Sequence, residues 1–336
     1  MSTSWKSFRY RLEAFGCRFL EVAIRKLSRR ACSGIGQFLG AVVYAFDSHG
    51  RSVALSNIEA VFGNSLTSQE RHSIARKSYQ NFARTMLDLF WAQNVTAHNF
   101  SEYTEAVGFK EALERAHREK RGIVFVCAHE GNWEWAALTF AHVGGSANIV
   151  AQDFKNKLLT PFFANLRTHG KHTLISQERA MLKLLKCVLR GEHTALLADL
   201  NVSPNQGPIL LKVFGPDPLE ICATQLHIVL AQRGNALLVP ATTIPLPNGK
   251  IKVIAHPPIE TSPEMSPHQI AQDTWAIFED LIRKQPELWL WSYKHFRYRP
   301  QDTTREYPFY ASISSGFEAL RKTTHQISST TPLQTT

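Results

Sequence analysis

From residue 105 onward, short apolar runs rich in β-branched residues alternate with stretches of helical periodicity. Uninterrupted apolar runs of this kind are typical of strands that are buried on both faces, as in parallel sheets. Each stretch between them is long enough for the crossover helix that parallel neighbours need. The alternation therefore predicts an α/β fold whose mostly parallel sheet is flanked by helices.

The predicted elements divide the chain into a helical N-terminal part and an α/β part. Strands are predicted at 123–128, 148–151, 173–175, 194–198, 210–214, 236–241 and 251–254. Helices are predicted between and after them at 109–119, 132–142, 157–168, 177–190, 220–233 and 267–284. The N-terminal helices are predicted at 5–30, 34–46, 51–62 and 67–93. We expect basic amphipathic helices over 1–50, a catalytic domain over 51–305, and a polar, flexible tail over 306–336.

The N-terminal 30 residues carry eight Lys or Arg against two Glu, within a chain whose net charge is +10. Six apolar residues recur every three or four positions among these bases and would form one stripe on a helix: Trp5, Phe8, Leu12, Phe15, Phe19 and Val22. A helix of this composition can lie at an anionic membrane surface with its apolar face down. The alternative is a helix that packs on its own domain with its bases in solvent.

No stretch reaches the roughly 20 apolar residues that span a bilayer, and residues 34–46 are the nearest candidate. The N-terminus also lacks the uninterrupted apolar run of a secretory signal, so we expect a location on the cytoplasmic side. The five cysteines are scattered and odd in number, which fits a reducing compartment and predicts neither a disulfide framework nor a zinc knuckle.

The most informative residues for chemistry follow the apolar run 123–128. His129 comes directly after it, at the carboxyl end of a predicted strand, where open α/β sheets hold their ligands. Gly131 permits a tight turn, and Asn132 can cap a helix that begins at Trp133. Glu134 then lies in the first helical turn, close enough to orient the imidazole. A histidine held by a carboxylate can act as a general base toward a hydroxyl.

The segment 128–134 resembles the His-x4-Asp/Glu block of the lysophospholipid acyltransferase superfamily. Within it, the sequence Gly-Asn-Trp-Glu resembles that of the bacterial lipid A biosynthesis acyltransferases of the late, lauroyl/myristoyl type. Further blocks resemble that family in the same order over roughly residues 50–300. They are Arg51 to Phe62 with Asn57-Ile58, Gly108 to Leu113, Lys155-Asn156, Arg167 to Gly170, Leu197 to Asp199, Val213 to Gly215, and Pro286 to Arg297.

The resemblance implies transfer of a fatty acyl group from acyl-carrier protein, or acyl-CoA, to a hydroxyl of a lipid A precursor or related glycolipid. It implies no cofactor and no metal. Anionic membrane lipid is the further expected partner, and nucleic acid is not expected. The resemblance also implies a peripheral or monotopic attachment to the cytoplasmic face of the inner membrane.

By the same resemblance His129 is the expected general base and Glu134 the residue that orients it. Six residues are expected to contact substrate: Gly131, Asn132, Lys155, Asn156, Arg167 and Asp199. Arg167 is a candidate for binding an acceptor phosphate or the carrier's phosphopantetheine, with a solvated helix residue as the alternative. Asp199 is a candidate for shaping the cleft or orienting a base, with a turn cap as the alternative. The sequence departs from the family at Gln152, where an Arg is usual.

Other classes of protein fit less well. A zinc-protease motif would need a second histidine at position 133, which is Trp133. The sequence has no Gly-x-Ser-x-Gly elbow, Walker loop or dinucleotide fingerprint. Two alternatives stay open: a catalytically degenerate membrane-bound scaffold of the same fold, and an acyltransferase whose acceptor is not lipid A.

Overall fold

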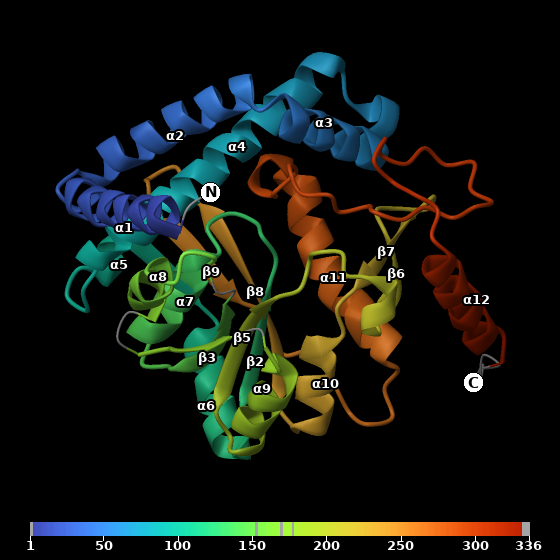
Figure 1. The fold of residues 1–336 in the computed structure, drawn as a ribbon. Coiled ribbons are helices and arrows are strands. Elements are labelled where there is room, and N and C mark those ends of the chain that lie inside the picture. The colour runs from blue at the N-terminus through green and yellow to red at the C-terminus, as the bar shows by residue number, and fades with distance from the viewer. Residues whose placement is uncertain (1–2, 152–153, 169–170, 177, 331–336) are drawn as a thin grey trace.

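The structure is a computed structural model that describes residues 3–151, 154–168, 171–176 and 178–330. A seven-stranded sheet forms its centre, with strand order β1-β9-β8-β2-β5-β3-β4 (Figure 1). The strands are β1 Thr104–Val107, β2 Ile123–Cys127, β3 Ala147–Ala151, β4 Thr173–Ser176, β5 His193–Leu197, β8 Leu237–Pro245 and β9 Ile251–Ala255. All neighbours are parallel except β8 and β9. The predicted fold class is confirmed.

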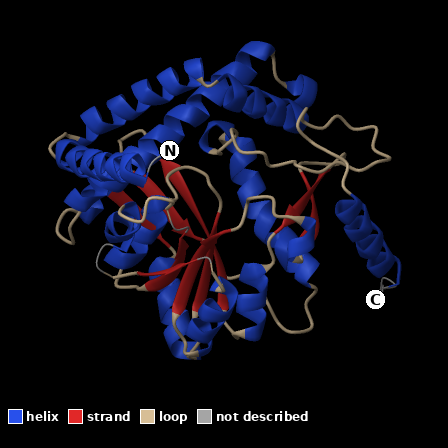
Figure 2. Cartoon of the chain, viewed as in Figure 1, coloured by secondary structure: helices blue, strands red, loops and turns tan. Residues whose placement is uncertain are grey.

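Helices cover both faces of this sheet (Figure 2). The residues of β2 alternate between two hydrophobic clusters: Val124 and Val126 face one, while Ile123 and Phe125 face the other. The first cluster receives side chains from α9 Ala180–Leu189, α10 Leu226–Arg233 and α11 Pro267–Lys284. The second receives side chains from α6 Phe109–Glu119, α7 Glu134–His142 and α8 Leu159–Thr168. Burial on both faces explains why β2 is apolar throughout.

Four helices precede the sheet: α1 Thr3–Arg25, α2 Arg29–Phe46, α3 Ser48–Phe62 and α4 Ser68–Trp91. A capping box between Thr67 and Glu70 begins α4. Glycine lets α2 pack against α4, because a Cβ at Gly40 would lie 2.4 Å from the Cα of Gln80. The helical N-terminal region is confirmed. Among the described residues, no helix combines the length and the apolar character that crossing a membrane requires.

A segment near the C-terminus returns to the N-terminal helices. The buried amide of Asn57, on α3, donates hydrogen bonds to the carbonyl oxygens of Trp291 at 2.8 Å and Tyr293 at 2.7 Å. This contact joins the Asn-Ile block to the block that ends at Arg297, over more than 230 positions. The two blocks of the family resemblance are therefore one structural unit.

In the α/β part, the structure differs from the predicted elements at residues 219–223 and at residues 104–107. The predicted helix 220–233 is wrong in its first part: β7 Leu219–Ala223 pairs antiparallel with β6 Ile209–Val213 as a separate hairpin, and α10 begins at Leu226. The run Leu-Glu-Ile-Cys-Ala is as compatible with a strand as with a helix, and its pairing with β6 makes it a strand. β1 was not predicted.

The C-terminal stretch that was expected to be a flexible tail contains a helix, α12 Ser315–Thr330. Phe317 is fully buried and packs with Leu210 and Cys222. One buried aromatic side chain thus anchors α12 to the β6–β7 hairpin. The remaining short elements are α5 Phe100–Tyr103 and the 3₁₀ turns η1 Gly63–Ser65, η2 Ala92–Asn94, η3 Pro204–Gln206 and η4 Pro286–Leu288.

Candidate active site

His129 and Asp199 meet at the carboxyl ends of neighbouring strands. His129 follows β2 and Asp199 follows β5, and the pairing of Cys127 with Leu197 brings both to the same edge of the sheet. The imidazole Nδ1 lies 2.7 Å from Oδ1 of Asp199. The backbone N–H of His129 donates to Oδ2 of the same carboxylate at 3.0 Å, and the indole N–H of Trp289 donates to Oδ2 at 2.9 Å. Three donors therefore fix this carboxylate.

The protonation of this pair follows from burial and charge. Burial alone would raise the pKa of Asp199, but the adjacent His129, with help from Trp289, lowers it to about 2. Burial alone would lower the pKa of His129, but the charge and hydrogen bond of Asp199, with a contribution from Glu134, raise it. The buried carboxylate is thus ionised at neutral pH and stabilises the imidazolium form of His129.

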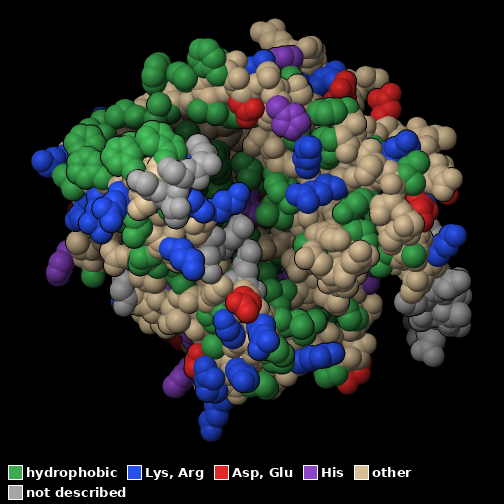
Figure 3. Space-filling model, viewed as in Figure 1, with side chains coloured by type: hydrophobic (Ala, Val, Ile, Leu, Met, Phe, Trp, Pro, Cys, Tyr) green, Lys and Arg blue, Asp and Glu red, His purple; other side chains and the backbone are tan. Residues whose placement is uncertain are grey.

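The other ring nitrogen of His129 is available for chemistry. Because Asp199 accepts a hydrogen bond at Nδ1, the proton of the neutral ring resides there and Nε2 is left as the acceptor. Nε2 has no hydrogen-bond partner within the described part of the chain, and the His129 side chain is 16% exposed. Figure 3 shows this face of the molecule hollowed at its centre, between the N-terminal helices and the C-terminal half.

The structure differs from the sequence prediction in what Glu134 contacts. Glu134 does lie in the first turn of α7, but its carboxylate pairs with Arg167 of α8, with Nη2 2.9 Å from Oε1 and Nε bonded to both oxygens. Asp199 occupies the position at Nδ1 that was predicted for Glu134. The reason is geometric: a residue beyond the end of the adjacent strand reaches the ring edge that faces the sheet, whereas α7 leads away from it.

Gly131 is required by the path of the loop that follows His129. Its φ is +55°, and a Cβ at this position would lie 2.1 Å from the carbonyl oxygen of Thr243. Its N–H donates to the carbonyl of Leu288 at 3.0 Å. Its own carbonyl accepts hydrogen bonds from Asn81 at 2.7 Å and Thr85 at 3.1 Å, both on α4. The loop is thereby fixed from three sides.

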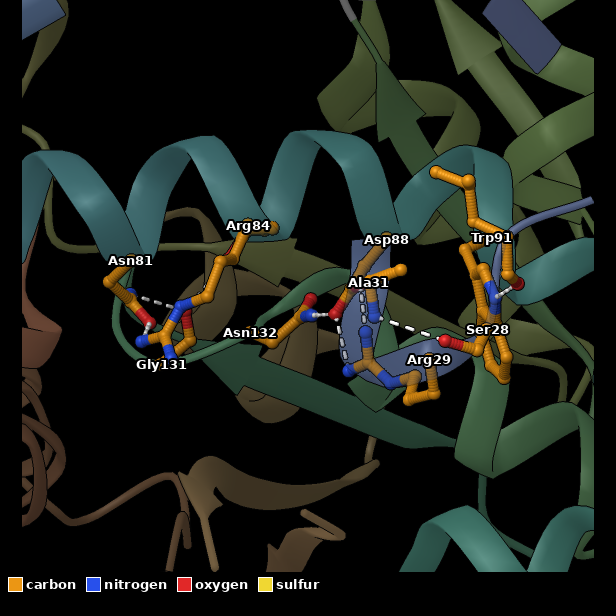
Figure 4. Close-up of polar contacts among 11 residues, drawn as sticks. Ser28, Arg29, Ala31, Asn81, Arg84, Asp88, Trp91, Gly131 and Asn132 are labelled. Carbon is orange, nitrogen blue, oxygen red and sulfur yellow. Dashed lines mark hydrogen bonds and ion pairs between the residues drawn. The ribbon is translucent and has the colours of Figure 1, made fainter. Parts of the chain in front are cut away.

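Asn132 connects this loop to the N-terminal helices (Figure 4). Its side-chain amide donates to Oδ2 of Asp88 at 2.7 Å, and its backbone N–H donates to Thr243 at 2.7 Å. Asp88 is buried on α4 and forms a two-bond ion pair with Arg29, the first residue of α2. The guanidinium of Arg29 also lies 5.1 Å from the ring of Trp91. A continuous chain of polar contacts therefore runs from the start of α2 to the loop after His129.

Glu130, beside His129, is buried with no hydrogen-bond partner for either carboxylate oxygen within the described residues. Burial, reinforced by the charge of Asp199, raises its pKa well above the usual value. The raised pKa favours the protonated, neutral form of Glu130. The protonated form costs less to bury than a carboxylate would, which fits the buried position of this side chain.

The other predicted substrate contacts lie around this site. Asn156 is buried and donates to the carbonyl of Tyr10 and the carboxylate of Glu13, both at 2.9 Å, so it holds α1 in place. Lys155 beside it is exposed. Gln152 lies outside the described residues. The substrate-binding roles of Gly131, Asn132, Lys155, Asn156, Arg167 and Asp199 stay predictions.

Sequence reasoning missed several residues that build the site. Asp88 was the detectable one, because it interrupts the apolar run Leu87 to Trp91 in a helix, and a charge there needs a partner. Trp289 and the buried His295, whose rings stack with centroids 3.8 Å apart, come from the closing segment and gave no local signal. Among the described residues, no three His, Cys, Asp or Glu side chains are grouped as metal ligands would be.

Comparisons with known proteins agree with the geometry. A family model described as "Bacterial lipid A biosynthesis acyltransferase" matches residues 2–298. The chain is also similar to a protein of Escherichia coli (strain K12) named "Lipid A biosynthesis lauroyltransferase". The two are 22% identical over 277 residues, which cover 81% of this chain and 87% of the relative.

Proposed function

The chain belongs to the bacterial lipid A biosynthesis acyltransferase family, and on this premise we propose that it moves a fatty acyl group from a carrier thioester to a hydroxyl of a lipid A precursor. The donor is acyl-carrier protein or acyl-CoA. The observation that carries the proposal is the 2.7 Å contact of His129 Nδ1 with the buried carboxylate of Asp199, at the carboxyl ends of β2 and β5. This pair supplies what a hydroxyl needs to attack a thioester.

The reaction proceeds through proton transfer at Nε2 of His129. The acceptor hydroxyl donates a hydrogen bond to Nε2, and its oxygen attacks the thioester carbonyl as the proton moves to the ring. Asp199 holds the ring and stabilises the imidazolium. When the tetrahedral intermediate collapses, the carbon–sulfur bond breaks, and the imidazolium returns its proton to the thiolate. The products are the ester and the free thiol of the carrier.

Arg167 and Glu134 act as a pair in this proposal. The planar guanidinium is a suitable ligand for a phosphate of the acceptor or of the carrier's prosthetic group. Glu134 fixes its orientation through two hydrogen-bonded nitrogens and adds negative potential near His129, where positive charge develops. Glu134 is thus a positioning residue for Arg167 and an electrostatic aid to His129.

We place the protein peripherally or monotopically on the cytoplasmic face of the inner membrane. Support comes from the exposed apolar side chains that α1 and α2 present together (Figure 3): Trp5, Phe8, Leu12, Phe15, Phe19 and Val22 on α1, and Ile35, Phe38, Leu39, Val43 and Phe46 on α2. Phe46 is 84% exposed and Phe15 68%. Monomeric proteins rarely leave so many neighbouring large apolar side chains in water. The arginines and lysines of α1 can bind the headgroups of anionic lipid.

The test is the initial rate of ester formation with acylated carrier protein and a lipid A precursor. His129→Ala should lower kcat by about 10²–10⁴-fold, the usual effect of losing a positioned base. His98→Ala, at an exposed histidine between η2 and α5, is the matched control and should be active. Absence of transfer by the wild-type protein on every hydroxyl lipid tested would favour the degenerate scaffold, and a normal rate for H129A would contradict the assignment of His129 as the base. Transfer to another hydroxyl lipid, but not to the lipid A precursor, would favour the different acceptor.

A further inference from the structure

Helix α9 exposes apolar side chains on the face that points away from the sheet. Its inner face is formed by Ala180, Leu184, Cys187 and Val188, which are buried in the core. On the outer face the exposed fraction is 48% for Met181, 57% for Leu182 and 63% for Leu189. An ordinary surface helix carries polar residues at such positions, so a stripe of large apolar residues indicates a contact surface.

The outer face of α9 is also basic. Lys183 and Lys186 are exposed between the apolar residues, and Arg179 lies directly before the helix. None of these three cations forms an ion pair with any residue that the structure describes, whereas Arg190 at the end of the helix pairs with Glu192 at 2.7 Å. The surface therefore combines apolar side chains with uncompensated positive charge. Its complement is an acidic surface that also offers apolar side chains.

The position of α9 relates this surface to the active site. The helix begins four residues after β4 ends, at the same sheet edge as His129. The strand order places β4 three strand spacings from β2, which is about 14 Å at 4.8 Å for each spacing. A group on a flexible arm that starts at the first turn of α9 thus needs to extend only a short way across the sheet edge to reach His129.

The membrane-facing surface lies elsewhere. Figure 1 shows α1 and α2 at the top of the molecule and α9 toward its lower end, in front of the sheet. Figure 3 shows Lys and Arg side chains gathered over this lower part, with the central hollow between them and the apolar side chains of the N-terminal helices. A bilayer that covers α1 and α2 leaves α9 in water. The partner of α9 is therefore a soluble molecule.

We propose that the outer face of α9, with Met181, Leu182, Lys183, Lys186 and Leu189, docks an acidic soluble protein that carries the acyl thioester on a flexible arm. This inference rests on the proposed function, because it names the surface at which the donor of that reaction binds. The lipid acceptor then approaches from the side of α1 and α2, and the donor from the side of α9. The two substrates therefore approach His129 from opposite directions.

The test compares the full-length K183E/K186E variant with wild-type protein, using one acyl chain on two donors. The first donor is acylated acyl-carrier protein, and the second is the same acyl group on pantetheine, which lacks the protein. We expect K183E/K186E to raise KM for acyl-carrier protein about tenfold or more, a loss of about 1.4 kcal/mol in binding, with kcat and the pantetheine reaction unchanged. The charge-matched control K110E/R118E, on the opposite face of the sheet, should behave as wild type.

A binding measurement separates failure of this proposal from failure of the proposed function. Fluorescence anisotropy of labelled acyl-carrier protein reports docking even if no transfer occurs. Weaker binding to K183E/K186E and to L182S/L189S, and binding of the wild type that weakens with salt, would support the surface. Unchanged carrier binding would overturn it, as would equal effects on both donors. A loss of binding to anionic vesicles in place of carrier binding would also overturn it, since α9 would then contact the membrane.

Discussion

The Nδ1 atom of His129 and the Oδ1 atom of Asp199 lie 2.7 Å apart although the two residues are separated by 70 positions. Asp199→Asn keeps the shape of this side chain and removes its charge. Because Asp199 raises the pKa of His129 against the effect of burial, the variant should have a lower His129 pKa. The acid limb of its pH–rate profile should move to lower pH. The plateau should fall, since the ring tautomer is no longer fixed.

A pH–rate profile with the wild-type midpoint in Asp199→Asn would contradict this assignment. Asp217→Asn, at an exposed carboxylate, is the control and should leave the profile unchanged.

Glu134 and Arg167 should behave as one unit in a double-mutant cycle. Glu134→Gln and Arg167→Gln each break the ion pair of 2.9 Å, so each should lower kcat/KM. The kcat/KM of the double variant should be only slightly below that of the less active single variant, because the second change removes a contact that is already lost. The measurement is the steady-state rate of acyl transfer. Independent, additive losses would show that the two side chains serve separate roles.

The ion pair of Arg29 with Asp88 should contribute to the free energy of unfolding. Arg29→Ala leaves a buried carboxylate without its cation, so the free energy of unfolding should fall by about 3–5 kcal/mol. Arg30→Ala, at the exposed neighbouring position, is the control and should change it little. Chemical denaturation measures both. The double variant R29M/D88L should recover part of the loss, and equal stability of R29A and R30A would contradict the prediction.

Glu130 gives a pH dependence of stability whose sign follows from its raised pKa. Between the usual value of 4.5 and the folded value, the unfolded chain ionises this carboxyl while the folded chain keeps it protonated. Folding therefore loses stability through this group as pH rises above about 4.5. Glu130→Gln removes the dependence, so its stability relative to wild type should increase from pH 5 to pH 8. A difference that is constant over this range would refute the buried neutral acid.

Membrane attachment should depend on the exposed aromatic residues of α1. The triple variant F8S/F15S/F19S keeps the basic residues and removes three side chains, each of which contributes about 1.5–3 kcal/mol when fully buried. We expect it to move from the membrane pellet to the supernatant after cell fractionation. The control V107S/F309S/I313S changes three exposed apolar residues elsewhere and should remain in the pellet. Retention of both variants would argue against docking through α1.

The fold was largely predictable because strand and helix periodicity is local. The run 123–128 is buried on both faces, and the predicted helix 267–284 agrees with α11. The predictions were wrong where contacts with segments distant in sequence determine the secondary structure. Residues 219–223 form a strand because β6 lies beside them, and 315–330 form a helix that one buried phenylalanine anchors.

The site was predictable only in part, for the same reason. The strand-end position of His129 and the turn at Gly131 are encoded within a few residues. The partner of the imidazole is not, because Asp199 reaches it through the register between β2 and β5. Glu134 lies five residues from His129 in sequence, but its carboxylate forms an ion pair with Arg167 from α8. Asp88 and Arg29 likewise depend on the packing of α4 against α2.

The carboxylate that steers His129 is itself held by Trp289, and the loop around Gly131 is bonded to Leu288. A chain emerging from the ribosome therefore presents its N-terminal helices long before its reaction centre is complete. With α1 docked on a bilayer as we propose, such a chain is attached while it is still inert. Activity switches on only when the last segment of the sheet domain folds back, so truncated products would occupy the membrane without hydrolysing or misdirecting acyl thioesters.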